Sequence, residues 1–403
     1  MVEWKTIEEL GSFFGGLTGK TKNDFVDGNA NFITYMNVFS NPSLNPSEVG
    51  AVKINEGEKQ NKIQKGDILF TGSSETPEET GMSCVVTDDL KEDFYMNSFC
   101  FGLRLYSPEQ VNLHYLKHIL RSEPVRKSIA KTASGVTRYN ISKARFSKIK
   151  LPIPSLSEQQ RIVSILDTFT SSISNLKQQI EERRKQYEYE RDLLLDLEGK
   201  EGVEMKKLGD CVLLITDGDH QPPPKSSKGI PFVTISDIEK LSHTIDFSNT
   251  FFVPQEYYNS LKTDKKAKKG DVLYTVTGSF GIPVLIEDNR EFCFQRHIAL
   301  IRPNNTIALS RYIYHWLCSN YAKKQGEEKA SGGAQKTVSL NSLRSFHFYY
   351  PSLQAQSHIV SILDTFEQSI SNLEEQLAMR EKQYEYYRNQ LLTFEGEEER
   401  GKT

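Results

Sequence analysis

A glycine-rich stretch near the start of the chain, Ser12 to Phe25 (SFFGGLTGKTKNDF), contains Gly-Lys-Thr, as phosphate-binding loops do. In such a loop a further glycine stands before Gly-Lys-Thr, with four residues between it and the second glycine. That position is Phe14, and the residues after Lys22 are polar and rich in turn formers rather than helical. The sequence therefore argues against a nucleotide-binding loop and favours a basic surface loop that contains Lys20 and Lys22.

Other patterns with catalytic potential are incomplete. His114 and His118 are spaced to share one face of a helix, but no glutamate lies between them and no third ligand is evident, so we expect no metal site. Asn41-Pro42 and Asn45-Pro46 lack the second proline of the Asn-Pro-Pro-aromatic motif of methyltransferases. No convincing nuclease or helicase motif is present, and we predict a chain without catalytic residues.

Length and composition limit the class of protein. A chain of 403 residues with 37% hydrophobic and 26% charged residues is typical of a soluble protein with two or more domains. The five cysteines are scattered without a CxxC pair, which favours reduced thiols in a cytoplasm. The sequence contains neither a run of 18 apolar residues nor an N-terminal signal peptide, so we expect a cytoplasmic protein without a membrane partner.

The net charge of −3 conceals strong clustering. Residues 104–150 contain 11 basic and 2 acidic residues, and residues 290–350 contain 9 and 3. The remaining material is more acidic, with 8 basic and 16 acidic residues in 1–103 and 5 and 10 in 351–403. Because clustered charge creates a local surface potential, the two basic blocks could follow a phosphate backbone.

The chain contains an internal repeat. The 45 residues that begin at Pro154 and the 45 that begin at Pro351 are identical at 28 positions. Weaker matches precede them: Lys65-Gly66-Asp67 resembles Lys269-Gly270-Asp271, and Ala133-Ser134-Gly135 resembles Ala330-Ser331-Gly332. Each half is therefore predicted to be a variable domain followed by a nearly constant segment.

The constant segment is predicted to be a long helix. Apolar residues recur every seven positions in two rows, which is typical of a coiled-coil seam. Arg183 and Arg380 interrupt the second row, either as arginines at the seam edge or as a polar register lock. The seam residues expected to pack or to bind other subunits are Leu166, Phe169, Ile173, Leu176, Ile180, Tyr187, Leu363, Phe366, Ile370, Leu373, Leu377 and Tyr384.

The ends of the helices are predicted from local signals. Ser157-Glu158-Gln159-Gln160 can form a capping box at the first start, whereas Gln354 replaces Ser157 in the second copy. Gly199 and Gly202 are expected to end the first helix. If the seams pair with each other, connectivity requires the two helices to be antiparallel, with one domain at each end.

The variable domains are predicted to be α+β. Short β-like runs occur near residues 32–38, 66–70, 231–235, 270–274 and 297–301, and helical stretches follow near 109–131 and 308–328. The expected fold is therefore two similar α+β domains separated by two long antiparallel coiled-coil helices.

Two similar basic domains on a stiff spacer suit duplex DNA with two separated half-sites. Basic, hydroxyl and amide side chains in loops are the groups that contact phosphates and base edges. The candidate DNA-binding residues are Lys20, Lys22, Thr34, Tyr35, Asn37, Ser73, Ser74, Thr137, Arg138, Tyr139, His220, Lys225, Thr277, Ser279, Phe280, Gln295, Arg296, His297, Gln335 and Lys336. For each residue taken singly, an ordinary solvated loop position is the alternative.

Several segments resemble the specificity subunits of type I restriction–modification systems. The similar segments are PSLSEQQRIV from Pro154, PSLQAQSHIV from Pro351, GGLTGKTKNDF from Gly15 and TDGDHQPPP from Thr216. The second copy departs from the family's Glu-Gln pair by having Ala355-Gln356, which we expect to weaken that helix start.

This resemblance implies a target-recognition domain at 1–153, a spacer helix at 154–200, a second recognition domain at 201–350, a second spacer helix at 351–395 and an acidic tail at 396–403. It also implies a pseudo-twofold arrangement, a double-stranded DNA target in two parts, two modification subunits and motor–nuclease restriction subunits. The modification subunits would methylate adenine N6 with S-adenosylmethionine after base flipping, and ATP and Mg²⁺ would likewise belong to partner subunits. A two-headed coiled-coil scaffold without DNA affinity, or a self-contained methyltransferase, would be the competing interpretations.

Overall fold

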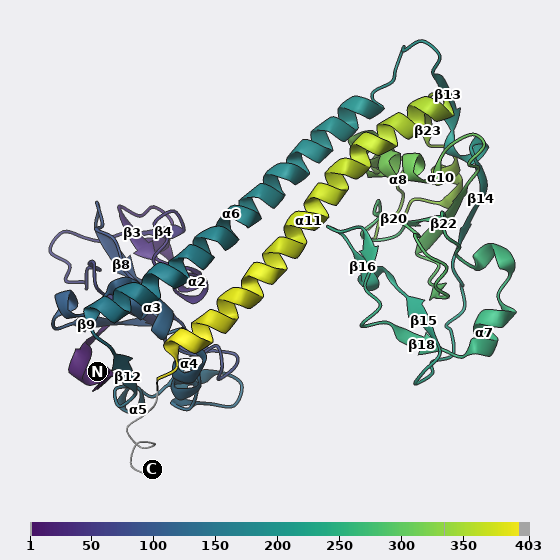
Figure 1. Cartoon of the computed structure of the whole chain (residues 1–403). Helices are drawn as coiled ribbons and strands as arrows, with labels where there is room; N and C mark the ends of the chain where they lie inside the picture. Colours follow the sequence, from purple (N-terminus) through teal and green to yellow (C-terminus); the bar gives the residue numbers. More distant parts are fainter. Residues whose placement is uncertain (1, 334, 395–403) are drawn as a thin grey trace. The chain divides into compact units, whose positions relative to one another are not determined.

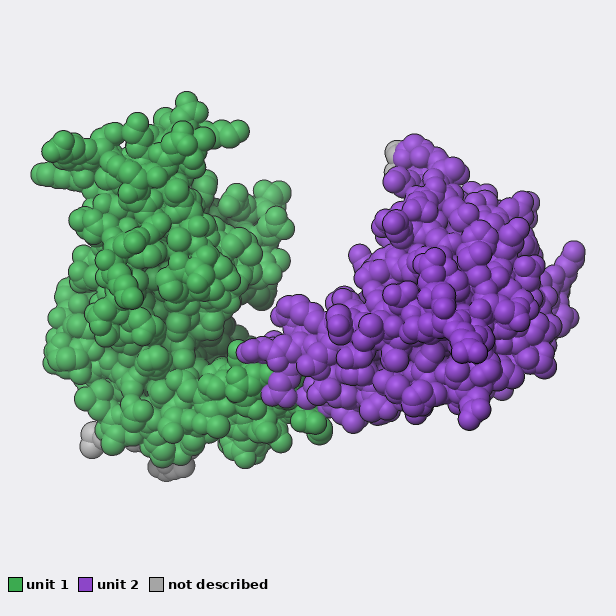
Figure 2. Space-filling model, turned by 90° about the horizontal axis from the view of Figure 1, so that it is seen from above, with its two compact units in different colours: residues 1–176, 376–403 green, residues 177–375 purple. Residues whose placement is uncertain are grey.

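The computed structural model describes residues 2–333 and 335–394. The chain divides into two compact units: residues 1–176 with 376–403, and residues 177–375 (Figure 2). We call the globular parts head 1 (residues 2–153) and head 2 (residues 204–350). The predicted acidic tail, 396–403, lies outside the described residues.

Head 1 is built on small sheets and short helices (Figure 1). Its four-stranded sheet has the order β2 (Gly11–Gly15), β9 (Cys100–Leu105), β5 (Ile68–Thr71) and β7 (Ser83–Val85). The smaller sheets are β4 (Val49–Val52), β3 (Ala30–Ile33) and β8 (Phe94–Met96); β10 (Ala133–Ser134), β11 (Tyr139–Ile141) and β6 (Ser73–Ser74); and β1 (Glu3–Thr6) with β12 (Lys150–Ile153). The helices are α1 (Ile7–Leu10), α2 (Tyr35–Ser40), α3 (Leu113–Ile119), α4 (Glu123–Ala130) and α5 (Lys143–Phe146), with 3₁₀ turns at Lys22–Phe25 and Pro108–Gln110.

Head 2 repeats this plan (Figure 1). Its four-stranded sheet has the order β14 (Val212–Asp217), β22 (Ile298–Pro303), β19 (Val272–Thr275) and β20 (Pro283–Leu285). The smaller sheets are β18 (Phe251–Val253), β15 (Ile230–Val233) and β21 (Cys293–Phe294); β16 (Ile238–Glu239) with β17 (Thr244–Ile245); and β13 (Glu204–Lys207) with β23 (His347–Tyr350). The helices are α7 (Gln255–Ser260), α8 (Ser310–Cys318), α9 (Asn320–Lys329) and α10 (Leu340–Arg344), with 3₁₀ turns at Leu208–Asp210, Ile235–Asp237 and Thr263–Lys265.

The predicted α+β class with two similar domains is confirmed, and most of the predicted strands and helices are present. One run was misjudged: residues 35–38 are in helix α2 rather than in a strand. Thr34 starts this helix, because its hydroxyl accepts a hydrogen bond from Asn37 N at 3.1 Å. The predicted helix near 308–328 is divided at Ser319, whose hydroxyl accepts from Ala322 N and caps α9.

Each head has its own aromatic core. In unit 1, the rings of Phe70, Phe101 and Phe146 contact one another with centroid distances of 5.0 to 5.5 Å. In unit 2, Trp316 packs on Phe348 with centroids 5.0 Å apart, and both are buried. Burial of these large apolar side chains is the main favourable contribution to the stability of each head.

The repeated Lys-Gly-Asp motif has a structural role in both heads. Gly66 and Gly270 adopt φ values of 89° and 90°, which favour glycine at the turn before β5 and β19. The following aspartates accept paired hydrogen bonds from an arginine: Arg104 bonds Asp67 at 2.9 and 2.7 Å, and Arg302 bonds Asp271 at the same two distances. The motif therefore places a buried aspartate that pairs with an arginine, rather than a ligand site.

Helices α6 (Leu156–Leu195) and α11 (Leu353–Leu392) are the long helices predicted from the heptads (Figure 1). In unit 1 the start of α6 packs with the end of α11, where Phe169 stacks on Tyr387 with centroids 5.2 Å apart. In unit 2 the end of α6 packs with the start of α11, where Tyr187 bonds Glu367 at 3.2 Å. The helix pairs are therefore antiparallel, as predicted.

The two arginines in the seam occupy matching positions. The Arg380 guanidinium lies 5.6 Å from the centre of the Phe169 ring, and Arg183 lies 5.9 Å from that of Phe366. Both arginines are half-buried. This geometry fits arginines at the seam edge that stack on the facing helix.

The predicted ends of the helices need correction. Ser155, not Ser157, caps α6, because its hydroxyl accepts from Glu158 N at 3.4 Å. Ser352 caps α11 in the same way through Ala355 N at 3.3 Å, so the second copy does not lack a cap. Helix α6 ends at Leu195, before Gly199, because Leu195 and Leu197 turn into the core of unit 2.

A buried glutamine joins the start of each long helix to its head. Gln159 accepts from Asn112 N at 2.8 Å and donates to Pro154 O at 2.7 Å. Gln356 accepts from Leu309 N at 2.9 Å and donates to Pro351 O, also at 2.9 Å. Both side chains are fully buried, so their hydrogen bonds are made without competition from water.

A histidine–aspartate–tyrosine contact forms a second junction in each unit. His118 Nε2 lies 2.7 Å from Asp167 on α6, and Tyr384 Oη on α11 lies 3.5 Å from its Nδ1. In unit 2, His315 Nε2 lies 2.8 Å from Asp364 on α11, and Tyr187 Oη on α6 lies 3.0 Å from its Nδ1. Each buried imidazole thus ties one head to both long helices.

Truncation of Gln356 should destabilise unit 2. Gln356→Ala leaves Leu309 N–H and two backbone carbonyls without their partner, which costs about 1–3 kcal/mol for a buried unsatisfied group. Urea unfolding should show a correspondingly lower midpoint. Ser357→Ala, at the exposed neighbouring position, is the control. Equal midpoints for the two variants would mean that the Gln356 hydrogen bonds do not stabilise unit 2.

Candidate nucleic-acid interface

Several of the candidate DNA-binding residues of head 1 lie at strands β6 and β11. Ser73 and Ser74 pair with Asn140 and Tyr139, and Tyr35 Oη donates to Ser73 O at 2.8 Å. Arg138 Nε donates to Ser73 Oγ at 3.1 Å, and the Arg138 side chain is exposed. The structure therefore joins three segments that are far apart in sequence: the start of α2, the loop after β5 and the turn before β11.

Two candidate DNA-binding side chains in head 1 are instead bonded to other residues of the head. Asn37 is fully buried, and its side-chain amide donates to Asn45 O and Glu48 O at 2.7 and 2.8 Å. Lys20 is mostly buried and pairs with Glu58 at 2.6 Å. The hydrogen bond from Lys20 helps to lower the pKa of Glu58 to about 2. These two side chains hold loops together, whereas Lys22 and Thr137 are exposed.

The corresponding part of head 2 brings together the loop after β19 and the segment before α10. Thr277 bridges to Thr337, and Gly278 N donates to Lys336 O at 3.0 Å. Ser279, Gln335 and Lys336 are exposed there, and Phe280 is half-buried. Ser73, Ser74 and Thr277 themselves are largely buried, so they support these segments rather than face solvent.

Two further candidate DNA-binding residues of head 2, His220 and Gln295, lie next to Asp219. This residue forms a β-bridge with Gln295 and accepts from Tyr257 Oη at 2.7 Å. His220 Nε2 lies 2.9 Å from Asp217. Arg296 and His297 follow Gln295. Lys225 precedes Ser226, which bridges to Phe252 on β18, and the Lys225 ammonium lies 5.1 Å from the centre of the Phe251 ring.

The sequence interpretation missed Asn97, Ser98 and Phe99 in head 1. Asn97 N donates to Ile33 O at 3.0 Å, just as Gln295 N donates to Val233 O in head 2. Gly72 N donates to Phe99 O at 2.9 Å, as Val276 N does to His297 O. Asn97–Phe99 therefore corresponds to Gln295–His297, although the sequences share no residue, and Phe99 is 61% exposed.

The basic blocks contribute less surface charge than their composition indicates. Arg121 donates to the carbonyls of Val38, Phe39, Asn41 and Ser83, and Arg126 donates to those of Glu78, Thr80 and Gly81. Burial lowers the pKa of both guanidinium groups to about 10, which leaves them charged at neutral pH. Their role is to neutralise carbonyl dipoles inside head 1.

The histidine junction in unit 1 contains a strongly acidic carboxyl. Burial opposes ionisation of Asp167, but hydrogen bonds from His118 and Lys117 outweigh burial and hold its pKa at about 2. In unit 2, His315, Asp364 and Glu367 lie close enough to suggest a metal site. Arg311 bonds both carboxylates, at 2.9 and 2.8 Å, so this arginine supplies the positive charge and the cluster is an ion-pair network.

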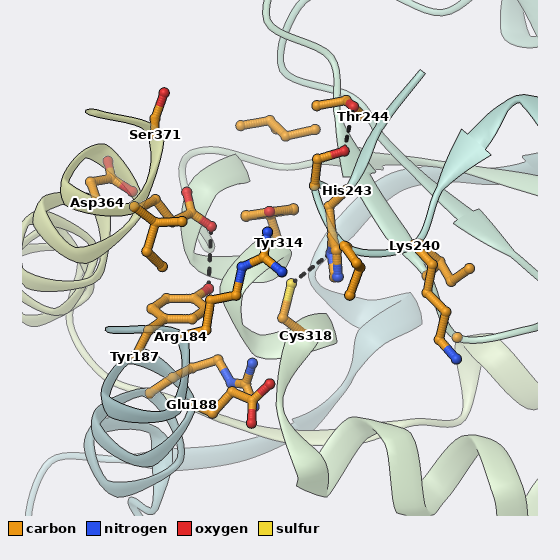
Figure 3. A pocket seen from close by; sticks show the side chains of 18 of the residues that line it. Arg184, Tyr187, Glu188, Lys240, His243, Thr244, Tyr314, Cys318, Asp364 and Ser371 are labelled. Atoms are coloured by element: carbon orange, nitrogen blue, oxygen red, sulfur yellow. Dashed lines mark hydrogen bonds between the residues drawn. The ribbon is translucent and has the colours of Figure 1, made fainter. Parts of the chain in front are cut away.

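A cavity of about 900 Å³ lies in unit 2 between α6, α11 and head 2 (Figure 3). Arg184, Tyr187, Tyr314 and Cys318 are among its lining residues. His243, at the turn between β16 and β17, also lines it and lies 3.4 Å from Cys318 Sγ through its Nδ1 (Figure 3). Burial, reinforced by Arg191 and Lys323, lowers the pKa of His243 to about 4.

Titration of His243 should make unit 2 less stable in mild acid. An unfolded chain binds this proton near pH 6.5 but the folded chain only near pH 4, so stability falls as pH decreases between these values, by at most about 1.4 kcal/mol per pH unit. His243→Asn keeps a residue that tolerates the φ of 54° and removes the titration. Urea unfolding between pH 7 and 5 should therefore depend less on pH in this variant. Ser242→Asn should retain the wild-type dependence, and identical slopes for all three proteins would refute the assignment.

Within the part of the chain that the structure describes, no helix combines the length and the apolar character needed to cross a membrane.

Comparisons with known proteins agree with the fold. Residues 1–183 and 200–379 match the model of the type I restriction modification DNA specificity domain. A type I restriction enzyme specificity subunit of Haemophilus influenzae is 31% identical over 71% of this chain and 73% of its own length. The EcoR124I/EcoR124II specificity subunit of Escherichia coli is 29% identical over 62% and 65%.

A solved chain from work on complex assembly and conformational transition of the type I restriction–modification system has a similar fold. The TM-score is 0.61 over 97% of both chains, with 18% identity. Since two copies of the specificity domain cover most of the sequence, this chain belongs to the family of type I restriction–modification specificity subunits.

Proposed function

We propose that this chain recognises a two-part DNA target, with one half-site bound by each head and the gap set by the paired helices. One observation carries the proposal: the heads have matching backbone frameworks but different exposed side chains at corresponding positions, while the segments that form the long helices are identical at 28 of 45 positions. Different recognition surfaces on a repeated frame are what two unlike half-sites require.

The partners follow from family membership. The helices would bind two modification subunits, which would methylate adenine N6 with S-adenosylmethionine, and motor–nuclease subunits would use ATP and Mg²⁺. The similarity to a chain solved in work on assembly of such a system supports this proposal. In this assignment the chain itself contributes recognition and spacing, carries no catalytic group and acts in the cytoplasm with the DNA.

Binding to duplex DNA in the presence of the modification subunits tests the proposal. A duplex that carries the methylated motif should bind more tightly than a scrambled duplex, and affinity should fall linearly on a plot of log affinity against log salt, because phosphate contacts release counterions. A scaffold without DNA affinity would show neither a sequence preference nor a salt dependence attributable to this chain, and that result would reject the proposal.

The gap between half-sites should follow the length of the helices. Seven residues inserted both after Gln178 and after Glu375 preserve the heptads and lengthen each helix by about 10 Å. Since base pairs are about 3.4 Å apart, the gap in the methylated motif should grow by about three base pairs while both half-sites stay unchanged. Methylome sequencing gives the result directly. An unchanged gap would mean that the helices do not set the spacing.

A further inference from the structure

One exposed position lies at corresponding places in the two heads but carries different side chains. Asn140 pairs with Ser73 on β6, and Thr337 bridges to Thr277 at the matching place in head 2. Two residues before these anchors stand Arg138 in head 1 and Gln335 in head 2, and both are exposed. The two side chains are therefore structural counterparts.

The glycines of the repeated Ala-Ser-Gly motif fix this position. Gly135 and Gly332 have φ values of 153° and 112°, in a region that side chains disfavour. A Cβ at Gly135 would lie 2.0 Å from Arg138 O, and one at Gly332 would lie 2.6 Å from Gln335 O. Each glycine thus allows its own backbone to lie close to the carbonyl of residue 138 or 335. The Ala-Ser-Gly motif is the same in both heads, whereas the exposed residue three positions after its glycine differs.

The Arg138 guanidinium is oriented by two contacts that leave part of it free to bind a planar base. Its Nε donates to Ser73 Oγ at 3.1 Å, and its guanidinium carbon lies 6.0 Å from the centre of the exposed Phe99 ring. Within the described residues its Nη1 and Nη2 groups have no hydrogen-bond partner. Two parallel N–H donors match O6 and N7 of guanine in the major groove.

Gln335 offers a different pattern. Its amide lies beside Gly278, where an added Cβ would come to 3.4 Å from Nε2. Within the described part of head 2 this amide has no hydrogen-bond partner. One donor and one acceptor side by side match N6 and N7 of adenine.

We propose that Arg138 and Gln335 are corresponding base-contacting residues, and that Arg138 recognises a guanine in the half-site of head 1 while Gln335 recognises an adenine in that of head 2. This inference rests on the proposed function and deepens it by assigning residues and bases. The main alternative is that Arg138 contacts a phosphate, which would affect affinity but carry no sequence information.

Exchange of the two residues provides the test. Arg138→Gln and Gln335→Arg are each assembled with the modification subunits, and the methylated motif is determined by methylome sequencing and by competition between duplexes. Arg138→Gln should reduce discrimination for one guanine about tenfold or more and shift the preference toward adenine, and it should leave the other half-site unchanged. Gln335→Arg should do the reverse in the second half-site.

Two further variants separate base contact from charge. Arg138→Lys keeps the charge but lacks the paired donors, so it should also lose the guanine preference. Lys143→Gln removes an exposed charge from the same head and should leave the motif unchanged. Retained recognition of the other bases in the altered half-site reports that the substituted head has folded.

The outcomes distinguish this inference from the proposed function. If Arg138→Gln weakens all duplexes equally without changing the motif, Arg138 contacts phosphate and the inference is wrong. If neither exchange alters a clear wild-type motif, the inference fails while the proposed function stands. If the wild-type protein has no sequence preference at all, the proposed function itself is rejected.

Discussion

The junction between each head and the long helices is the constraint on which the rest of the structure depends. In each unit a fully buried glutamine at the helix start bonds the backbone of its head, and a buried histidine contacts an aspartate on one long helix and a tyrosine on the other. Buried polar groups are costly when unpaired, so each head has one favourable orientation on its own part of the helix pair. Such a fixed connection is what a protein that measures distance would require.

The same constraint explains why the two halves of the sequence diverge unevenly. Residues of the junction serve both the helix and the head, and they are retained in both copies: Gln159 and Gln356, His118 and His315, Asp167 and Asp364. Residues that hold the sheets are retained as well, as the Asp67–Arg104 and Asp271–Arg302 pairs show. Arg138 and Gln335, which are exposed beside these anchors, differ between the two heads.

Charge has two separate uses in this chain. Arg121 and Arg126 neutralise carbonyl dipoles in the interior of head 1, and Arg311 bonds two carboxylates on α11. Other cations, such as Lys22, Arg138, Arg296 and Lys336, are exposed. A count of basic residues along the sequence therefore overstates the surface available to an anionic partner.

The sequence by itself determined the long helices, their antiparallel pairing and the repeated α+β plan. Heptad spacing and internal identity are local, periodic signals, and a helix of 40 residues repeats them many times. Its ends were predicted less well: Ser155 rather than Ser157 caps α6, and α6 stops at Leu195 because Leu195 and Leu197 enter the core of unit 2.

Only the tertiary structure decided which loop residues are available at the candidate site. Asn37 and Lys20 look like surface groups in the sequence, yet the fold encloses them with partners 8 and 38 residues away. The correspondence of Asn97–Phe99 with Gln295–His297 is invisible in the residues, since backbone hydrogen bonds to distant strands establish it. Segments without a common residue can occupy corresponding positions in the two heads because backbone hydrogen bonds, which do not depend on residue type, set those positions.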